Sequence, residues 1–256
     1  NIKSVHTNPN ISIASATINV IDAASYNDAT DINVFTTAQV TLQSVEDTNT
    51  NILKIDQIGS SQVSMTAAKV KVTNKVNNAE VDALDAITSG IITVDILEDT
   101  FNEISALDAL LDVDISVAVI TVTNDVNKTN ADTLNGFTTG TVTLTSITDN
   151  FTNVKAAQGT AGIAMTAATI ETDNTEAVTK ANVDTLNGFT TGVVTVKSVR
   201  DTRTNVEAID LIDDGEVLMN TAIVSVTDAV TKAQADTLNG FTAGQVTLES
   251  VQDTNA

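Results

Sequence analysis

Five aspartates recur at matching places in this 256-residue chain, and their spacing is its strongest chemical pattern. They are Asp47, Asp99, Asp149, Asp201 and Asp253. Each follows a run in which β-branched and polar residues alternate, so each is expected to close a β-strand. Carboxylates repeated at one corner, with Asn and Thr oxygens beside them, are ligands that Ca²⁺ prefers. One hypothesis is therefore a series of weak calcium sites at these strand ends.

The same aspartates have a structural interpretation. Asp and Asn often precede a helix, because their side chains accept unpaired N–H groups of its first turn. A second set of polar corners also carries Asp or Asn, namely Asp22, Asn74, Asn124, Asn174 and Asp228. Alternation of Asp with Asn dilutes the charge that a strong calcium site needs, and the glycine-rich nonapeptide of calcium-binding β-rolls does not occur. We therefore expect the aspartates to act chiefly as helix caps.

The sequence offers little for catalysis. His6 is the single histidine, there is no cysteine, and neither a phosphate-binding loop nor an H-E-x-x-H motif occurs. Parallel β-helix lyases build acidic clefts from irregular insertions, and this chain is too uniform to supply them. We expect no catalytic residue, no enzyme activity and no cofactor other than weakly bound Ca²⁺.

These residues belong to a tandem repeat. The stretch ADTLNGFTTGTVTLTSITD at residues 131–149 returns at 183–201 and 235–253, with weaker copies at 29–47 and 81–99. The repeats are counted on Ala38, Gly90, Gly140, Gly192 and Gly244, which are 52, 50, 52 and 52 residues apart. A fixed period of this length is the signature of a repeat array. The two sets of polar corners divide each repeat into a first and a second half-unit of about 26 residues.

Each half-unit is expected to hold one strand and one short helix. Second half-unit strands are predicted at residues 40–44, 92–96, 142–146, 194–198 and 246–250, and first half-unit strands around Ile18, Val70, Ile120, Ile170 and Val224. In the first half-unit helices, Leu134, Leu186 and Leu238, each with a Phe three residues later, should face inward. Gly136, Gly188 and Gly240 are expected to end these helices in the left-handed conformation, whereas Val34 and Ala86 should give weaker ends in the first two repeats.

Strand, helix and parallel strand in succession predict an α/β repeat solenoid with one parallel β-sheet and short outer helices. The alternative is a straight β-solenoid with 52-residue coils, in which the helical segments are only corner loops. Residues 1–256 are expected to form a single array of about five repeats, part of a longer array, with the segment up to about Pro9 the least periodic.

The composition of the chain argues against several classes of partner. The net charge of −21 argues against nucleic acid and anionic membrane surfaces as partners. No segment is long and apolar enough to span a bilayer, so membrane insertion is not expected. Aromatic residues make up 3% of the chain, so the core must consist of Val, Ile, Leu and Ala.

A threonine column offers one further possibility. The strand faces opposite the core should carry Thr41, Thr93, Thr143, Thr195 and Thr247. Flat threonine arrays suit ice binding, but the residues two positions on are charged and irregular, and Thr favours strands in any case. A ligand-binding face would also need a local break in the repeat, such as an aromatic patch, and the sequence shows none.

The segments ADTLNGFTTG, VTL and S-V-D, separated by strands such as ITVTN, resemble the repeat arrays of giant bacterial cell-surface and adhesin-like proteins of the marine cyanobacterial type. This resemblance implies an extracellular or cell-surface location and a scaffolding, adhesive or motility-related role. We therefore expect a structural repeat segment of an extracellular fibre, surface layer or giant surface protein, which contacts itself end to end or laterally, or contacts further repeats. The alternative is an adhesive module that recognises glycan or another cell surface.

Overall fold

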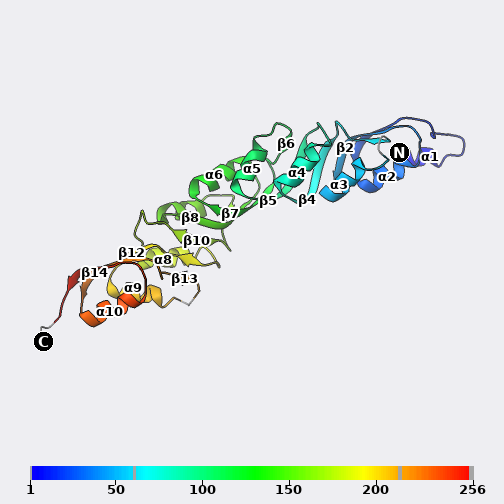
Figure 1. Ribbon diagram of the computed structural model, residues 1–256. Coiled ribbons are helices and arrows are strands. Elements are labelled where there is room, and N and C mark those ends of the chain that lie inside the picture. The colour runs from blue at the N-terminus through cyan, green and yellow to red at the C-terminus, as the bar shows by residue number, and fades with distance from the viewer. Residues whose placement is uncertain (1, 60–61, 213–214, 254–256) are drawn as a thin grey trace. The chain divides into compact units, whose positions relative to one another are not determined.

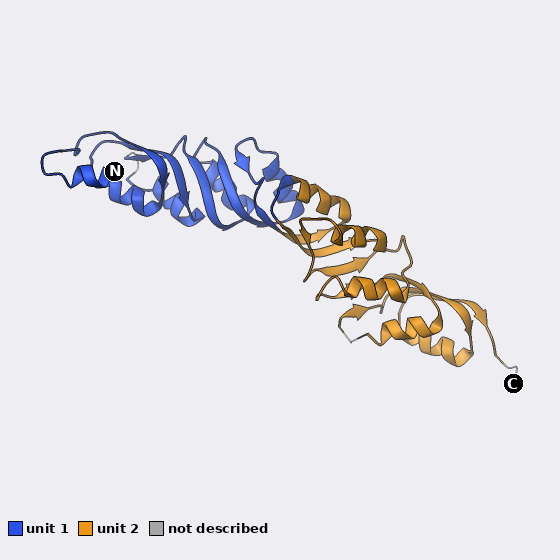
Figure 2. Ribbon diagram, turned by 180° about the vertical axis from the view of Figure 1, so that it is seen from behind, with its two compact units in different colours: residues 1–120, 137–140 blue, residues 121–136, 141–256 orange. Residues whose placement is uncertain are grey.

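The computed structural model describes residues 2–59, 62–212 and 215–253 (Figure 1). Two compact units divide the chain: residues 1–120 with 137–140, and residues 121–136 with 141–256 (Figure 2). Short helices and parallel strands alternate along each of them. Among the described residues, no helix has the length and apolar content needed to cross a membrane.

The helices fall into two series. After α1 (Ile2–His6), the first half-unit helices are α2 (Tyr26–Asn33), α4 (Asn78–Asp85), α6 (Lys128–Phe137), α8 (Lys180–Asn187) and α10 (Lys232–Gly240). The second half-unit helices are α3 (Asn49–Asp56), α5 (Phe101–Asp108), α7 (Phe151–Gln158) and α9 (Arg203–Asp210). In unit 1 the helices α2 to α5 contact one another in order, and in unit 2 the helices α7 to α10 do the same. These segments are true α-helices, so the alternative that treats them as corner loops is wrong.

The strands follow the same division. First half-unit strands are β1 (Ile18–Ala24), β4 (Lys69–Val76), β7 (Val119–Val126), β10 (Thr169–Thr172) and β14 (Ile223–Val230). Second half-unit strands are β2 (Val40–Asp47), β5 (Ile92–Asp99), β8 (Val142–Asp149), the pair β11 (Val194–Thr195) and β12 (Ser198–Asp201), and β15 (Val246–Val251). Short strands β3 (Val63–Ser64), β6 (Val113–Asp114), β9 (Ile163–Ala164) and β13 (Val217–Leu218) follow the second half-unit helices.

The strands pair in parallel and form a large sheet, which confirms the α/β class. A 12-stranded sheet has the order β1, β2, β4, β5, β7, β8, β10, β11, β13, with β3, β6 and β9 pairing with β2, β5 and β8. A second sheet has the order β12, β14, β15. The prediction of one uninterrupted sheet is therefore wrong, because the fourth repeat divides it.

The division lies where β10 stops early. Two more residues separate Ile170 from Val178 than separate Ile120 from Val126. Thr172 stands where β4 has Val72, and its fully buried hydroxyl accepts the N–H of Lys197 at 3.1 Å. The chain then leaves the 12-stranded sheet, and its next pairing is a bridge from Val178 to Val199 of β12, in the second sheet. The repeat thus does contain a local break, which the sequence analysis did not recognise.

The core matches the predicted alternation. Apolar residues at the start of β2, β5 and β8, such as Val40 and Leu42, are fully or almost fully buried, as are Leu134, Leu186 and Leu238 on the helices. The phenylalanines that follow these leucines are only half-buried. The next residue, a threonine in each repeat, is buried instead.

The predicted glycine caps are wrong. Gly188 ends α8 with φ −73° and ψ −12°, close to the φ −77° and ψ −11° of Val34 at the end of α2. The helix end is closed by a tighter turn, in which the N–H of Phe189 donates to the carbonyl of Leu186. Because this turn needs no left-handed residue, the first two repeats lose nothing by lacking glycine here.

Candidate functional site

Four of the five aspartates named by the sequence, all except Asp253, are the last residues of strands, and none of these four is the N-cap residue of the helix that follows. Asp47, Asp99, Asp149 and Asp201 are the last residues of β2, β5, β8 and β12, and Asp253 lies two residues beyond β15. The N-cap positions of the following helices belong to the next residues, Thr48, Thr100, Asn150 and Thr202. The cap prediction therefore assigned the aspartates to the wrong helix.

Each of these strand-end aspartates instead caps the helix that precedes it in the sequence. The carboxylate accepts the N–H of the first helical residue, 21 positions back. These bonds are Asp47 to Tyr26 at 2.9 Å, Asp99 to Asn78 at 2.9 Å, Asp149 to Lys128 at 3.0 Å, Asp201 to Lys180 at 2.8 Å and Asp253 to Lys232 at 3.0 Å. All five repeats share this contact, so negative charge lies at the positive end of each first half-unit helix.

The other carboxylate oxygen holds the chain that leaves the strand. Asp149 Oδ1 accepts the N–H of Asn150 at 2.8 Å and the side-chain amide of Asn153 at 2.8 Å. Asp47 and Asp201 make the same pair of bonds, with Asn51 and Asn205 as the amide donors. One side chain therefore fixes two successive helices.

The second set of polar corners works in the same way. Asn74 accepts the N–H of Asn49 at 2.7 Å, and Asp228 accepts the N–H of Arg203 at 2.6 Å. In the fourth repeat the predicted corner, Asn174, does not take this role. Glu176 accepts the N–H and the hydroxyl of Thr152 in its place, because the loop after β10 displaces Asn174.

The electrostatics follow from these donors. Burial of the Asp47 carboxyl, the largest single influence, raises its pKa. Hydrogen bonds from Tyr26, Asn51 and Thr48 outweigh that effect, so the pKa of Asp47 lies below its ordinary value. The pKa of Asp201 is lowered in the same way, against a raising effect of burial, by its bonds from Asn205, Lys180 and Thr202. Both groups are held as carboxylates by the fold.

The arrangement does not gather the aspartates into one centre. A first half-unit strand lies between consecutive second half-unit strands, for example β4 between β2 and β5, so Asp47 and Asp99 are roughly 10 Å apart along the sheet. In the described part of the chain, no group of three or more His, Cys, Asp or Glu side chains is placed to hold a metal ion. A calcium ion at a strand end would have to compete with the helix N–H groups for the same oxygens.

The structure brings forward a polar feature that sequence reasoning missed. A buried threonine in each repeat, named here the threonine bridge, donates its hydroxyl to an alanine carbonyl on the neighbouring half-unit and accepts the N–H two residues ahead. The members are Thr36, Thr88, Thr138, Thr190 and Thr242, with donor distances of 2.6 to 2.7 Å to Ala16, Ala68, Ala118, Ala168 and Ala222. The signal was present as a T-x-G or T-x-A motif in every copy.

The residue that donates to the bridge is Gly90, Gly140, Gly192 or Gly244, and Ala38 in the first repeat. At Gly140 an added Cβ would lie 2.2 Å from the carbonyl oxygen of Ala118, which is backbone and cannot turn away. By contrast, an added Cβ at Gly136 would meet nothing within 4 Å. In the second to fifth repeats, the close approach of two backbones therefore selects glycine at the bridge position, whereas it places no such demand on Gly136.

The predicted lysine–aspartate pairs form on the helices, and His6 makes a contact with a nearby aromatic ring. Lys128, Lys180 and Lys232 form ion pairs with Asp132, Asp184 and Asp236 on the exposed helix faces. His6 stacks on Phe35, with ring centroids 4.1 Å apart.

Comparison of the chain with family models, with curated proteins and with solved structures finds no match.

Proposed function

We propose that this chain is a structural repeat segment of an extracellular fibre, surface layer or giant cell-surface protein. The observation that carries the proposal is the use made of the polar groups. In all five repeats, the strand-end aspartates and the threonine bridges form their hydrogen bonds with neighbouring half-units. Polar groups that bond to neighbouring half-units stabilise the fold itself. This use of polar groups is what a scaffold protein needs.

The proposal extends to the architecture. Two half-units of about 26 residues, each with one strand and one helix, form the repeat of an α/β solenoid that runs as a single array. Helices with their side chains are wider than the spacing between strands, which favours helices on the outer side. The resemblance to giant surface proteins of marine cyanobacterial type and the net charge of −21 support an extracellular, self-contacting module.

The location can be tested directly. An antibody raised against the 256-residue chain is applied to thin sections of the source cells, followed by gold labelling and electron microscopy. Gold on an outer layer or on fibres is the expected result, and antibody pre-absorbed with the chain is the control. Label restricted to the cell interior would contradict the proposal.

A second candidate function, recognition of glycan or another cell surface, has one observation in its favour. The break after β10 exposes Asn174, Thr175 and Ala177 at one place in the repeat. A glycan array probed with the chain, and with a variant whose residues 169–178 are replaced by the regular segment 119–126, would separate the candidates. Binding that disappears in the variant supports recognition, and equal or absent binding favours the structural role.

A further inference from the structure

A contact recurs between the end of a first half-unit helix and the loop that precedes the next short strand. In the first four repeats it joins Asn33 with Gln62, Asp85 with Asp112, Asn135 with Gly162 and Asn187 with Glu216. In the first and fourth repeats the asparagine amide donates to the facing side chain over 3.4 Å. Asparagine thus supplies one member of three pairs, and of these four repeats only the second places two carboxyl groups face to face.

The contact between Asp85 and Asp112 needs a proton. Their side chains hydrogen-bond to each other, and two ionised carboxylates can only accept. Burial, and then the Asp112 and Asp82 carboxylates, raise the pKa of Asp85. Asp85 is also the last residue of α4, where the negative end of the helix dipole favours the neutral carboxyl. Asp85 therefore holds its proton to a higher pH than an ordinary aspartate.

The helix α4 also lacks the lysine that its later counterparts carry. In the third, fourth and fifth repeats, the aspartate at the place of Asp82 pairs with a lysine four positions earlier: Asp132 with Lys128, Asp184 with Lys180 and Asp236 with Lys232. In α4 the place of the lysine is taken by Asn78, whose amide donates to Asp82 over 3.4 Å. Asp82 thus gains a neutral donor in place of a cation, and its charge acts on Asp85.

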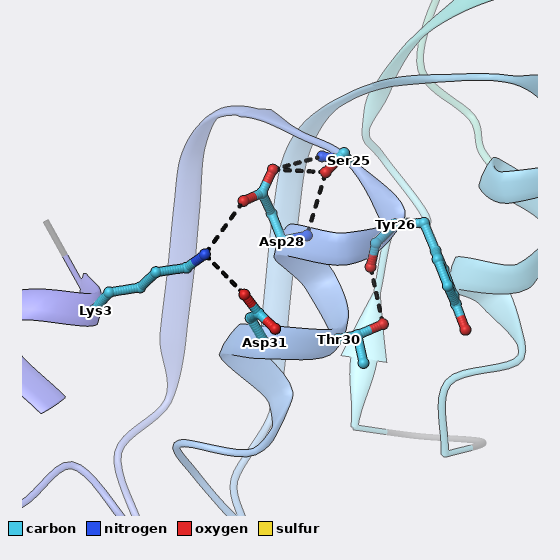
Figure 3. A network of polar contacts seen from close by, with 6 residues as sticks. All are labelled: Lys3, Ser25, Tyr26, Asp28, Thr30 and Asp31. Atoms are coloured by element: carbon cyan, nitrogen blue, oxygen red, sulfur yellow. Dashed lines mark hydrogen bonds and ion pairs between the residues drawn. The ribbon is translucent and has the colours of Figure 1, made fainter.

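The first repeat shows how an acidic helix is neutralised in this fold. On α2, the counterpart of α4, Asp31 and Asp28 lie 2.8 Å and 3.7 Å from the ammonium group of Lys3 (Figure 3). No such cation serves Asp85. The elements packed against α4 include α3, α5 and β5, yet within the described residues the charged groups that act on Asp85 are Asp112 and Asp82 alone. The pair therefore responds to the pH around it.

The backbone holds Asp112 beside the end of α4. The N–H of Ile92 donates to the carbonyl of Asp112 at 2.7 Å, and β6 pairs with the start of β5 through Val113 and Asp114. Because these bonds keep the two aspartates together, loss of the shared proton sets two like charges against each other at short distance. The element that yields most easily is β6, since it has only two residues.

A short strand can leave the sheet by itself. In the first repeat, β2 pairs with β3 through Val40 and Thr41, and with β4 only from Ser44 onward. The second repeat has the same order of elements, with β6 and β7 both beside β5. Separation of β6 from β5 therefore leaves the longer strands in place, and it exposes Val113, which is only 8% exposed when β6 is paired.

We propose that Asp85 and Asp112 form an acid-closed latch: a proton shared by their carboxyl groups holds residues 109–114 against α4, and its loss as the pH rises releases this segment from the sheet. The sign follows from the raised folded pKa of Asp85. Stabilisation by the latch is complete below the ordinary aspartate value of about 4 and is lost as the pH rises through the folded value. The latch depends on the fold of unit 1 and not on where the protein is located.

A spin label on the segment tests the latch. The chain has no cysteine, and Leu111 is fully exposed, so Leu111→Cys carries a single nitroxide without disturbing the core. Electron paramagnetic resonance should show a mobile component that grows about threefold or more as the pH rises from about 4 to about 7.5. Circular dichroism at each pH establishes that the chain stays folded. A mobility that does not change with pH would overturn the proposal.

Two substitutions on the labelled chain identify the groups responsible. Asp85→Asn gives the kind of pair found in the fourth repeat, and the double change Asp85→Asn with Asp112→Gln reproduces the Asn33–Gln62 pair of the first. In both variants the segment should stay held at every pH in this range. A pH response that persists in either folded variant would assign the release to another group and contradict the latch.

Two controls separate the latch from a general effect of pH. Asp108→Asn removes a carboxyl at the end of α5, outside the pair, and should leave the response of the label unchanged. Ala161→Cys places the label at the equivalent exposed position of the third repeat, where Gly162 supplies no carboxyl, and its mobility should not depend on pH. An equal response at Ala161, or a response abolished by Asp108→Asn, would count against the Asp85–Asp112 pair.

Discussion

The first half-unit strands of the second and fourth repeats differ in a way that shows which contacts hold neighbouring half-units together. Strand β4 runs for eight residues and pairs on both sides, whereas β10 ends after four, at a buried threonine where β4 has valine. The threonine bridge survives in both repeats, through Thr88 and Thr190. The strand-end aspartates Asp99 and Asp201 also keep their helix contacts. A repeat can thus lose part of its strand pairing as long as the polar contacts between half-units remain.

The largest expected effects come from breaking a threonine bridge, first in a regular repeat. Gly140→Ala forces a Cβ against the backbone of Ala118 and should destabilise the chain by about 2 kcal/mol or more. Gly136→Ala is the matched control, four residues away in α6, and should stabilise by about 0.5 to 1 kcal/mol. Chemical denaturation followed by circular dichroism measures both. Two variants with the same sign would mean that backbone approach does not select glycine here.

The same substitution at Gly192 changes the equivalent glycine of the fourth repeat, where β10 is shortened. Its Cβ would approach the carbonyl oxygen of Ala168 to 2.4 Å. Because β10 forms fewer strand pairs than β4, Gly192→Ala should lower the free energy of unfolding at least as much as Gly140→Ala, by about 2 kcal/mol or more. A clearly smaller cost, measured by the same denaturation, would show that the broken repeat tolerates displacement of the bridge.

Repair of the break should have an intermediate effect. Replacement of residues 169–178 by the sequence of 119–126 removes two residues and puts valine in place of Thr172. We expect a gain of about 1 kcal/mol, because a buried hydroxyl is replaced by an apolar side chain and the strand can continue. Amide hydrogen exchange at Lys197 and Val199 should slow. Faster exchange, or lower stability, would show that the break is the better structure for this repeat.

Two aspartates should respond to pH with opposite signs. The pKa of Asp201 is lowered in the folded chain, so this carboxylate stabilises above about pH 4 and the contribution is lost as the pH falls through its folded pKa. Burial, and then the nearby Asp112 and Asp82 carboxylates, raise the pKa of Asp85, so stability from this group is present at acid pH and is lost as the pH rises.

At neutral pH, Asp201→Asn should therefore lower the free energy of unfolding by about 0.5 kcal/mol, and Asp85→Asn should raise it by about the same amount. The midpoint of thermal unfolding should shift in the same directions. The effect of Asp201→Asn should shrink as the pH falls below about 4 towards the lowered folded pKa of Asp201. The effect of Asp85→Asn should shrink earlier, as the pH falls through the raised folded pKa of Asp85. Thermal unfolding across this pH range decides the matter. Effects of equal sign, or effects that do not depend on pH, would contradict the assignment.

The smallest expected effect is that of calcium. With a net charge of −21, many weak contacts at the strand-end aspartates should let Ca²⁺ raise the thermal midpoint slightly more than NaCl of equal ionic strength. The helix N–H groups already bound to these oxygens keep the effect small. Calorimetry with Ca²⁺, NaCl and a chelator measures it. Identical midpoints would leave the aspartates with capping alone, and one tight stoichiometric site would reveal a coordination loop elsewhere.

The sequence predicted features that depend on periodicity. Alternation of side chains located the strands and their buried residues, such as Val40 and Leu42, and helical spacing located Leu134. These predictions succeeded because burial follows directly from which face of a strand or helix a residue occupies.

The sequence did not reveal features that depend on which half-unit lies beside which. Asp149 looks like a cap for the next helix, and only the stacking of strands shows that it reaches Lys128 instead. Thr138 looks like a surface residue, because a hydroxyl can satisfy itself in water or across a packed boundary equally well. The sequence could not predict the backbone conformation of Gly188, since glycine adopts either sign of φ.

The direction of the aspartate contacts has a consequence for synthesis of the chain. Each carboxylate reaches back to a helix that begins 21 residues earlier, so that helix stays incomplete until the following strand has been made. On the ribosome, every newly emerged strand completes the element produced just before it. The chain can therefore fold progressively from its amino-terminal side, because each of these contacts waits for only 21 more residues to be made.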